Sequence, residues 1–536
     1  MGFQLGKTGL LDPDEPFYSL TAKEMLEHRD PWTPRMFGEP QFEKPIFFYW
    51  VLYASFRYLG ISEFSARLGP CVAGILTVLV VYLWGRILFK RPEPAFLSAA
   101  ILASSGQFIV LSRIVLTDIF LCLFVTAALA SFSWGYSNPA RRTFAWRLFF
   151  LFAGLGFLTK GPVGLLIPLS GILVYAVMSG EGWILRCFPW GSGLLLFSAV
   201  SFPWYVLMVQ THGAGFLSHF FIHENVRRFF VAEHKGMDRW YFYPFVFLFG
   251  FFPWSAFIAA GFSHALGPRR GPSKRTVLFL LSVFLTPFCF FMLAKSKLMS
   301  YIFPLYPVAA LLAGAWGWRL TRAFRLGHPP KPVFGWANSA VWGLAPVSLV
   351  AGAFFFAADQ ELPIFKPIAA IALTMIPLSW AALYFFFEKS MPTAYFSIIT
   401  AVTIFSGLSF GWMMPEAGQA FSSKRWAQDY GHLGSGAPNG LFLASKMFVR
   451  GMTFYSGLKN VGVFSGQPKG GFYTPHPIPI FSAAKDFLKL KKGEFPVYFL
   501  IRKKELRHLR EGLEPGFSVS VLEQSPLRIL AKLEHV

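Results

Sequence analysis

Acidic and basic side chains interrupt this largely apolar sequence at a few places where they could do chemistry together. The residues concerned are Asp14, Glu15, Glu43, Lys44 and Asp118. A carboxylate can deprotonate or orient an incoming hydroxyl, and an ammonium can bind phosphate. These residue types therefore indicate a polar site that handles both an anion and a nucleophile.

A simpler reading exists for the first of these acids. Asp12 and Asp14 flank Pro13, and an Asp-Pro-Asp sequence also favours a turn. That reading serves less well for Asp118, which falls inside an apolar stretch where a carboxylate needs a partner.

The elements that must position these residues are transmembrane helices. Hydrophobic residues make up 54% of the 536 positions and charged residues only 14%, whereas soluble proteins carry roughly 25% charged residues. Apolar runs long enough to cross ~30 Å of hydrocarbon recur from about residue 67 to about residue 414, which predicts about twelve spans. They begin near Leu68, Ala95, Ile114, Phe144, Pro162, Gly191, Tyr241, Thr276, Tyr301, Pro332, Phe365 and Ala394. The shorter aromatic run from Pro45 to Leu59 is interpreted as interfacial or re-entrant.

Loop charges give the orientation, because Lys and Arg collect in cytoplasmic loops. Every second loop is basic, and these loops contain Lys90, Arg91, Arg141, Arg142, Arg147, Arg186, Arg269, Arg270, Lys274, Arg275, Arg319, Arg322, Arg325 and Lys331. The alternate loops, residues 1–43, 210–240 and 359–361, are therefore exterior. This bias explains the formal net charge of +22 better than a nucleic-acid partner does.

Basic residues at the exterior face break this orientation rule. They are Arg113, Lys160, Lys295 and Lys297. A single such lysine could simply extend its amine to the headgroups. Several on one face, together with exterior acids, instead suggest a functional site, because ionisable groups near hydrocarbon are costly.

The segment 219–230 leaves two alternatives open. His219 and His223 are four residues apart and would share a helical face that could bind a metal. The segment lacks the second histidine of a metalloprotease helix. The other reading is an interfacial helix that turns Arg227 or Arg228 toward phosphate.

The chain changes character after about Pro415. Short β-like runs at 440–444 and 496–501 alternate with helical segments at 482–491 and 503–511, which predicts a small α/β domain of roughly 110 residues. None of the four cysteines lies there, so no disulfide framework or zinc site is available to it. We divide the chain into an exterior acidic loop with interfacial helices (1–66), a transmembrane domain (67–414) and an exterior α/β domain (415–536).

Several motifs occur in the same order as in one family of membrane enzymes. They are Asp12-Pro-Asp-Glu-Pro-Phe-Tyr18, Ala22-Lys-Glu-Met-Leu26, Phe37-Gly-Glu-Pro40, Phe42-Glu-Lys-Pro45, Tyr49-Trp50, Ser62-Glu-Phe-Ser-Ala-Arg67, Leu116-Thr-Asp118, Thr159-Lys-Gly161, the stretch 224–229 and Lys295-Ser-Lys-Leu-Met-Ser-Tyr301. The sequence thus resembles the bacterial aminoarabinose lipid A transferases and their protein O-mannosyltransferase relatives. An ordered series of this kind is far more specific than any one motif.

This resemblance implies an all-α polytopic membrane protein with the C-type glycosyltransferase fold and a small C-terminal α/β domain. Such enzymes take a sugar from a polyprenyl phosphate carrier and usually invert the anomeric centre. Carried over to this chain, the resemblance makes Asp14 the catalytic acidic residue with Glu15 beside it, and Asp118 the second carboxylate, while Glu43 and Lys44 line the site. The candidates for the carrier phosphate are Lys160, Arg228, Lys295, Lys297 and Tyr301.

The sequence departs from the family pattern at two points. Relatives usually have a spanning helix before the acidic loop, whereas only residues 1–11 precede Asp12 here, so we expect a truncated or misassigned start. Phe17 stands where relatives often carry arginine, and any contact made by that arginine is absent here. The resemblance is therefore a weaker guide to the exact substrate.

We therefore expect a multi-pass enzyme of the cell (inner) membrane, with its active site and C-terminal domain on the exterior, periplasmic side. It would move aminoarabinose, mannose or a similar sugar from a polyprenyl-phosphate carrier to lipid A, another glycolipid or a protein hydroxyl. Lipid A modification is favoured because the length, loop pattern and tail most resemble that branch. No metal ligand set is predicted, although two nearby carboxylates would permit a divalent cation.

A transporter or flippase for the carrier lipid is the alternative from another class. Such proteins often contain internal repeats with broken helices at the bilayer midplane. Here the charges gather at one face and no repeat is apparent.

Overall fold

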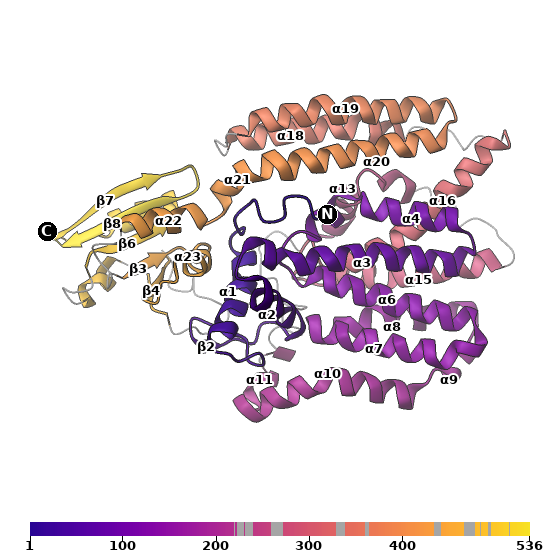
Figure 1. Cartoon of the computed structure of the whole chain (residues 1–536), viewed down its shortest axis with the longest axis horizontal. Helices are drawn as coiled ribbons and strands as arrows, with labels where there is room; N and C mark the ends of the chain where they lie inside the picture. Colours follow the sequence, from indigo (N-terminus) through magenta and orange to yellow (C-terminus); the bar gives the residue numbers. More distant parts are fainter. Residues whose placement is uncertain are drawn as a thin grey trace.

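A bundle of long apolar helices forms most of the molecule. The computed structural model describes residues 1–218, 220–221, 230, 239–258, 272–327, 338–359, 364–433, 441–465, 478–482, 484–490, 495–513 and 515–535. Figure 1 shows the bundle helices lying side by side, with a smaller sheet domain at one end and the short helix α9 (Trp183–Cys187) at the other. The main bundle helices are α3 (Glu63–Phe89), α4 (Pro92–Ala103), α6 (Asp118–Ser137), α7 (Arg142–Lys160), α8 (Val163–Ser179), α10 (Trp190–His212), α15 (Pro272–Leu293), α16 (Tyr306–Arg325), α18 (Ala345–Asp359), α19 (Phe365–Phe387) and α20 (Met391–Leu408).

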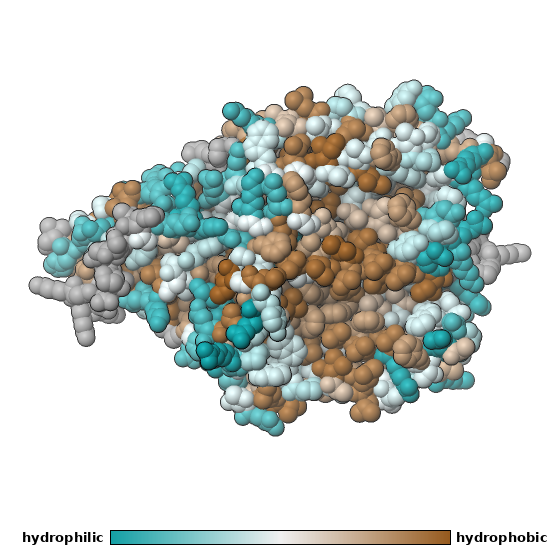
Figure 2. All heavy atoms as spheres, in the orientation of Figure 1, coloured by the Kyte–Doolittle hydropathy of each residue, from teal (hydrophilic) through white to brown (hydrophobic). Residues whose placement is uncertain are grey.

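The outer surface of the bundle is apolar, as lipid contact requires. On α3, for example, Ile75, Leu79 and Leu83 are each about half exposed, and an apolar band crosses the bundle between more polar ends (Figure 2). Within the described residues, seven helices are long and apolar enough to cross a membrane. The chain is therefore a polytopic membrane protein, and the count of about twelve spans stays a prediction.

One helix begins later than expected. Hydropathy predicts that the apolar run starts near Ile114, but α6 begins at Asp118. The turn before it is occupied by an irregular segment that follows α5 (Gly106–Leu111). Asp118 consequently lies at a helix N-terminus, not inside a span.

The first 60 residues fold into two short helices and a small hairpin. These are α1 (Asp14–Glu27), β1 (Arg35–Met36), β2 (Glu39–Pro40) and α2 (Phe47–Leu59). With 13 residues, α2 is shorter than the ~20 that a span needs. It packs its aromatic side chains on α1 and α6 instead, for example Phe48 against Tyr18 at 5.2 Å between ring centroids.

The C-terminal region is a mixed six-stranded sheet in the order β5-β4-β3-β6-β8-β7. The strands are β3 (Phe442–Ala444), β4 (Val461–Phe464), β5 (Ile480–Phe481), β6 (Val497–Ile501), β7 (Phe517–Gln524) and β8 (Ile529–His535). Strands β3 to β6 pair in parallel, and β8 joins antiparallel. All five residues of β6 are buried, as is typical of a strand covered on both faces.

Helices cover the two faces of this sheet. On one face lie α22 (Lys424–Leu433) and α23 (Val449–Ser456), and on the other the 3₁₀ segment η7 (Ala484–Lys489) and α24 (Lys503–Glu511). The predicted α/β character of this region is confirmed.

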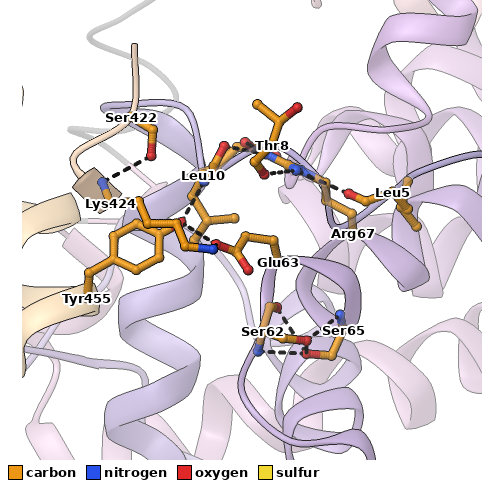
Figure 3. Close-up of polar contacts among 12 residues, drawn as sticks. Leu5, Thr8, Leu10, Ser62, Glu63, Ser65, Arg67, Ser422, Lys424 and Tyr455 are labelled. Atoms are coloured by element: carbon orange, nitrogen blue, oxygen red, sulfur yellow. Dashed lines mark hydrogen bonds and ion pairs between the residues drawn. The ribbon is translucent and has the colours of Figure 1, made fainter. Parts of the chain in front are cut away.

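The sheet domain is fixed to the N-terminal segment by buried polar contacts. Arg528 forms an ion pair with Asp12 at 2.9 Å, and both side chains are almost completely buried. Tyr455 and Lys424 both reach Glu63 at the start of α3, and the Tyr455 hydroxyl also accepts a hydrogen bond from the Leu10 backbone N–H (Figure 3). These contacts hold the sheet domain against the N-terminal segment and the start of α3.

Candidate active site

A large cavity lies where α1, α6, α7, α13 (Phe242–Gly250) and α23 meet. Its volume is about 1540 Å³. Polar and charged side chains line one part of it: Asp14, Glu43, Lys44, Gln107, Asp118, Lys160, Tyr301, Lys446 and Arg450. An apolar part is lined by Val163, Leu166, Phe220, Phe221, Phe242, Phe245, Phe249, Phe290 and Phe291. The cavity can thus hold a molecule that has a polar, charged end and a long apolar end.

Asp118 and Lys160 form a close ion pair at the cavity wall. Lys160 Nζ lies 2.5 Å from Asp118 Oδ1, with both side chains mostly buried. The same ammonium lies 5.2 Å from the ring centroid of Tyr301, within cation–π range. Three of the predicted site residues, which are distant in sequence, are therefore brought together.

Asp14 is the first residue of α1 and its side chain is open to the cavity. The protein around the cavity displaces bulk water from the carboxylate, and this burial raises the pKa of Asp14. Arg450 and Lys44 act in the opposite direction, while Asp118 and Glu15 add to the increase. Asp14 is therefore a better proton acceptor than an ordinary aspartate.

Glu15 does not line the cavity, although it follows Asp14 in sequence. Its carboxylate is buried and accepts hydrogen bonds from Arg67 Nε at 2.8 Å and Nη2 at 2.5 Å. The Val115 backbone N–H donates to it as well. Arg67 in turn donates to the backbone carbonyls of Leu5 and Thr8 (Figure 3), and also to that of Gly9. The ion pair of Glu15 with Arg67 thus joins the N-terminal segment to α3 and stabilises the fold.

Glu43 and Lys44 both line the cavity, in the turn before α2. The Glu43 backbone N–H donates to Gln41, whose side-chain amide donates to the Tyr49 hydroxyl at 2.6 Å. This buried network fixes the turn against α2. Both side chains are therefore held on a well-anchored segment.

The remaining predicted phosphate ligands are placed differently. Lys297 is buried and Lys295 is exposed, and neither side chain lines the cavity. Their neighbours Ser296 and residues 298–301 do line it. Arg228, like His219, His223 and Arg227, lies outside the described residues. Arg113, the other exterior base, donates to the backbone carbonyls of Met1 and Phe3 and stacks on Phe410 at 3.9 Å. It anchors the N-terminal segment.

Sequence reasoning missed two cations, Lys446 and Arg450, which reach the cavity from the sheet domain. In a polar region they break no orientation rule, so charge placement could not single them out. Gln107 was also missed; its amide donates to the Met299 carbonyl at 2.9 Å and so ties α5 to the loop that carries Tyr301.

No group of three or more His, Cys, Asp or Glu side chains is arranged to hold a metal ion in the part of the chain that the structure describes. The sequence permits a divalent cation on two nearby carboxylates without predicting one, and that option stays untested.

The arrangement of these parts identifies the fold. A bundle of long apolar helices, an N-terminal helix α1 that carries Asp14 to a large cavity, and a C-terminal α/β domain together form the C-type membrane glycosyltransferase fold. The apo structure of ArnT from Cupriavidus metallidurans superimposes with a TM-score of 0.80 at 21% identity, covering 99% of this chain and 95% of that one. The form bound to undecaprenyl phosphate gives a TM-score of 0.78.

Similarity in sequence points the same way. The family model described as dolichyl-phosphate-mannose-protein mannosyltransferase matches residues 8–220. The undecaprenyl phosphate-alpha-4-amino-4-deoxy-L-arabinose arabinosyl transferase of Edwardsiella ictaluri is 33% identical over 312 residues, which are 57% of this chain and 55% of that protein. Its counterpart in Pectobacterium atrosepticum is 32% identical over 64% of this chain and 62% of that protein. The matches thus span less than two thirds of these relatives, and the resemblance inferred from the motifs is confirmed.

Proposed function

We propose that the chain is a membrane glycosyltransferase that moves a sugar from a polyprenyl-phosphate carrier to an acceptor. The observation that carries this proposal is the cavity, which combines an accessible carboxylate of raised pKa, a set of cations and an apolar wall. The apolar wall suits a polyprenyl chain, and the cations suit its phosphate.

The chemistry follows from these positions. The acceptor oxygen gives its proton to Asp14 and attacks the anomeric carbon, while the bond from that carbon to the phosphate oxygen breaks. Polyprenyl phosphate leaves with the electron pair, and Lys44 and Lys160 stabilise the charge that develops on it. Asp118 keeps the Lys160 ammonium in place, and Tyr301 offers its ring face to the same ammonium.

The identities of the donor sugar and of the acceptor are the more specific part of the proposal. The curated relatives named above are aminoarabinose transferases, which favours undecaprenyl phosphate-aminoarabinose as donor. The motif resemblance favours lipid A or another glycolipid as acceptor. We place the enzyme in the inner membrane with the cavity and residues 415–536 on the periplasmic side, because the loops at the opposite helix ends are basic.

A protein O-mannosyltransferase activity is the second candidate. The mannosyltransferase family model matches the segment that carries Asp14, Glu43, Asp118 and Lys160. That match favours a polyprenyl-phosphate mannose donor and a protein hydroxyl acceptor.

A matrix of donors and acceptors tests these alternatives. Purified protein in liposomes would be given radiolabelled undecaprenyl phosphate-aminoarabinose or polyprenyl-phosphate mannose, each with lipid A or a Ser/Thr-rich peptide. We expect transfer from the aminoarabinose donor to lipid A. Mannose transfer to the peptide would support the second candidate, and donor binding without any transfer would support a carrier-lipid transporter and contradict the proposal.

A further inference from the structure

Helix α23 of the sheet domain is the element that brings this domain to the cavity. Lys446 and Met447, just before the helix, and Arg450, in its first turn, all line the cavity wall. The remaining walls come from segments that end before residue 302. One short helix from a distant part of the chain therefore closes the polar end of the site.

Buried contacts on its other side fix α23 in place. The Tyr455 hydroxyl donates to Glu63 at 3.0 Å and accepts from the Leu10 N–H at 2.7 Å (Figure 3). Lys23 of α1 donates to the Phe454 carbonyl at 2.9 Å. A Cβ atom at Gly451 would overlap the Asp12 carboxylate, so the helix approaches the N-terminal segment as closely as the backbone allows. Arg450 thus sits on a rigid support.

The guanidinium of Arg450 is aimed at the helix that carries Asp14. It lies 4.7 Å from the ring centroid of Phe17, and Phe17 is three residues after Asp14, on the same face of α1. Arg450 has the largest effect of any positive charge on Asp14, and it also interacts with Glu43. The aromatic ring restricts where the guanidinium can move while leaving its charge directed to the carboxylates.

We propose that Arg450 is a positioning residue of the active site, which makes the sheet domain part of the catalytic unit. It holds the Asp14 carboxylate in its ionised, proton-accepting form. The inference rests on the proposed function, because it assigns Arg450 a role through the catalytic carboxylate.

The charges around Asp14 give the direction of the effect. Arg450 faces it from α23 and Lys44 from the turn before α2, whereas Asp118 of α6 and Glu15 of α1 oppose its ionisation. Removal of Arg450 leaves the carboxylate between two other acids with Lys44 as the main compensating charge. The ionised form then becomes harder to reach, and a higher pH is needed to obtain it.

The test is the pH dependence of sugar transfer in the full-length protein. Arg450→Gln and Arg450→Met remove the charge, and the methionine keeps an apolar chain over Phe17. Arg450→Lys keeps the charge, and Arg507→Gln, an exposed arginine of α24, is the matched control. We expect the charge-removing variants to lose at least tenfold in transfer at neutral pH, with the acidic limb of the profile moved to higher pH.

Arg450→Lys should keep the parental limb, and Arg507→Gln should match the parent in both rate and profile. If Gln or Met at position 450 leaves the acidic limb where the parent has it, the inference is wrong, whatever happens to the rate. If Arg450→Gln does not fold, the acidic limb of Arg450→Met alone tests the inference. If the parent itself moves no sugar from any donor, the proposed function fails instead.

Discussion

Lys160 Nζ lies 2.5 Å from Asp118 Oδ1, and this contact joins the C-terminal end of α7 to the N-terminal end of α6. Each charge complements the dipole of its own helix, since an acid is favoured at a helix N-terminus and a base at a C-terminus. Two helix ends and one ion pair thereby fix a cation at the cavity wall. That arrangement suits a site that must hold a leaving phosphate.

The first prediction concerns this pair. Asp118→Asn leaves Lys160 without its carboxylate, so the ammonium can take other positions in the cavity. We expect transfer to fall about 100-fold, as displacement of a positioned group typically causes. The measurement is the single-turnover rate with saturating donor. Glu93→Gln, an exposed acid of α4 outside the cavity, should keep the parental rate, and an unchanged rate in Asp118→Asn would rule out a role for the pair.

The second prediction separates Glu15 from Asp14. Glu15→Gln removes one charge from a buried ion pair with Arg67, which typically lowers the free energy of unfolding by about 3 kcal/mol. Arg67→Met should lower it by a similar amount, because it removes the hydrogen bonds that Arg67 donates to the Glu15 carboxylate and to three backbone carbonyls. Thermal unfolding in detergent checks both. Parental stability combined with lost transfer would instead place Glu15 in catalysis.

The third prediction concerns the stability of an Asp14 variant. The pKa of Asp14 is raised in the folded state, so its contribution to stability is present at low pH and is lost as the pH rises through the folded-state pKa. At neutral pH the ionised carboxylate is therefore unfavourable for folding. Asp14→Asn should unfold at the same temperature as the parent or higher at pH 7, with the difference vanishing under acid conditions. A lower unfolding temperature at pH 7 would contradict the raised pKa.

The fourth prediction concerns the contact between the sheet domain and the N-terminal segment. Tyr455→Phe leaves the Leu10 N–H and the Glu63 carboxylate each without one partner, and unsatisfied buried groups cost about 1–3 kcal/mol. We expect faster proteolysis in the region of residues 422–465 and lower transfer. Tyr58→Phe, at a residue that is 84% exposed, is the control and should change neither. Equal proteolysis of the two variants would show that Tyr455 does not anchor the domain.

Much of the fold could be predicted from the sequence, because apolar runs of spanning length and alternating loop charges depend on local composition. The start of α6 shows the limit of this approach. Hydropathy places the run near Ile114, yet the helix begins at Asp118, where the carboxylate benefits from the helix N-terminus.

The site could be predicted only in part. Asp14 and Glu15 are adjacent, and successive helical residues point about 100° apart, so both could not face one cavity. Nothing in the sequence indicates whether Asp14 or Glu15 forms the ion pair with Arg67. Lys446 and Arg450 are about 430 residues from Asp14 along the chain, and only tertiary packing brings them to the cavity.

The most direct test of the central claim is sugar transfer by Asp14→Asn. The parent and the variant would be reconstituted at equal amounts with labelled undecaprenyl phosphate-aminoarabinose and lipid A, and donor binding would be measured on the same samples. We predict that the variant binds donor as the parent does but transfers sugar about 10²–10⁴-fold more slowly, the usual contribution of a positioned base. Transfer by Asp14→Asn at the parental rate would contradict it.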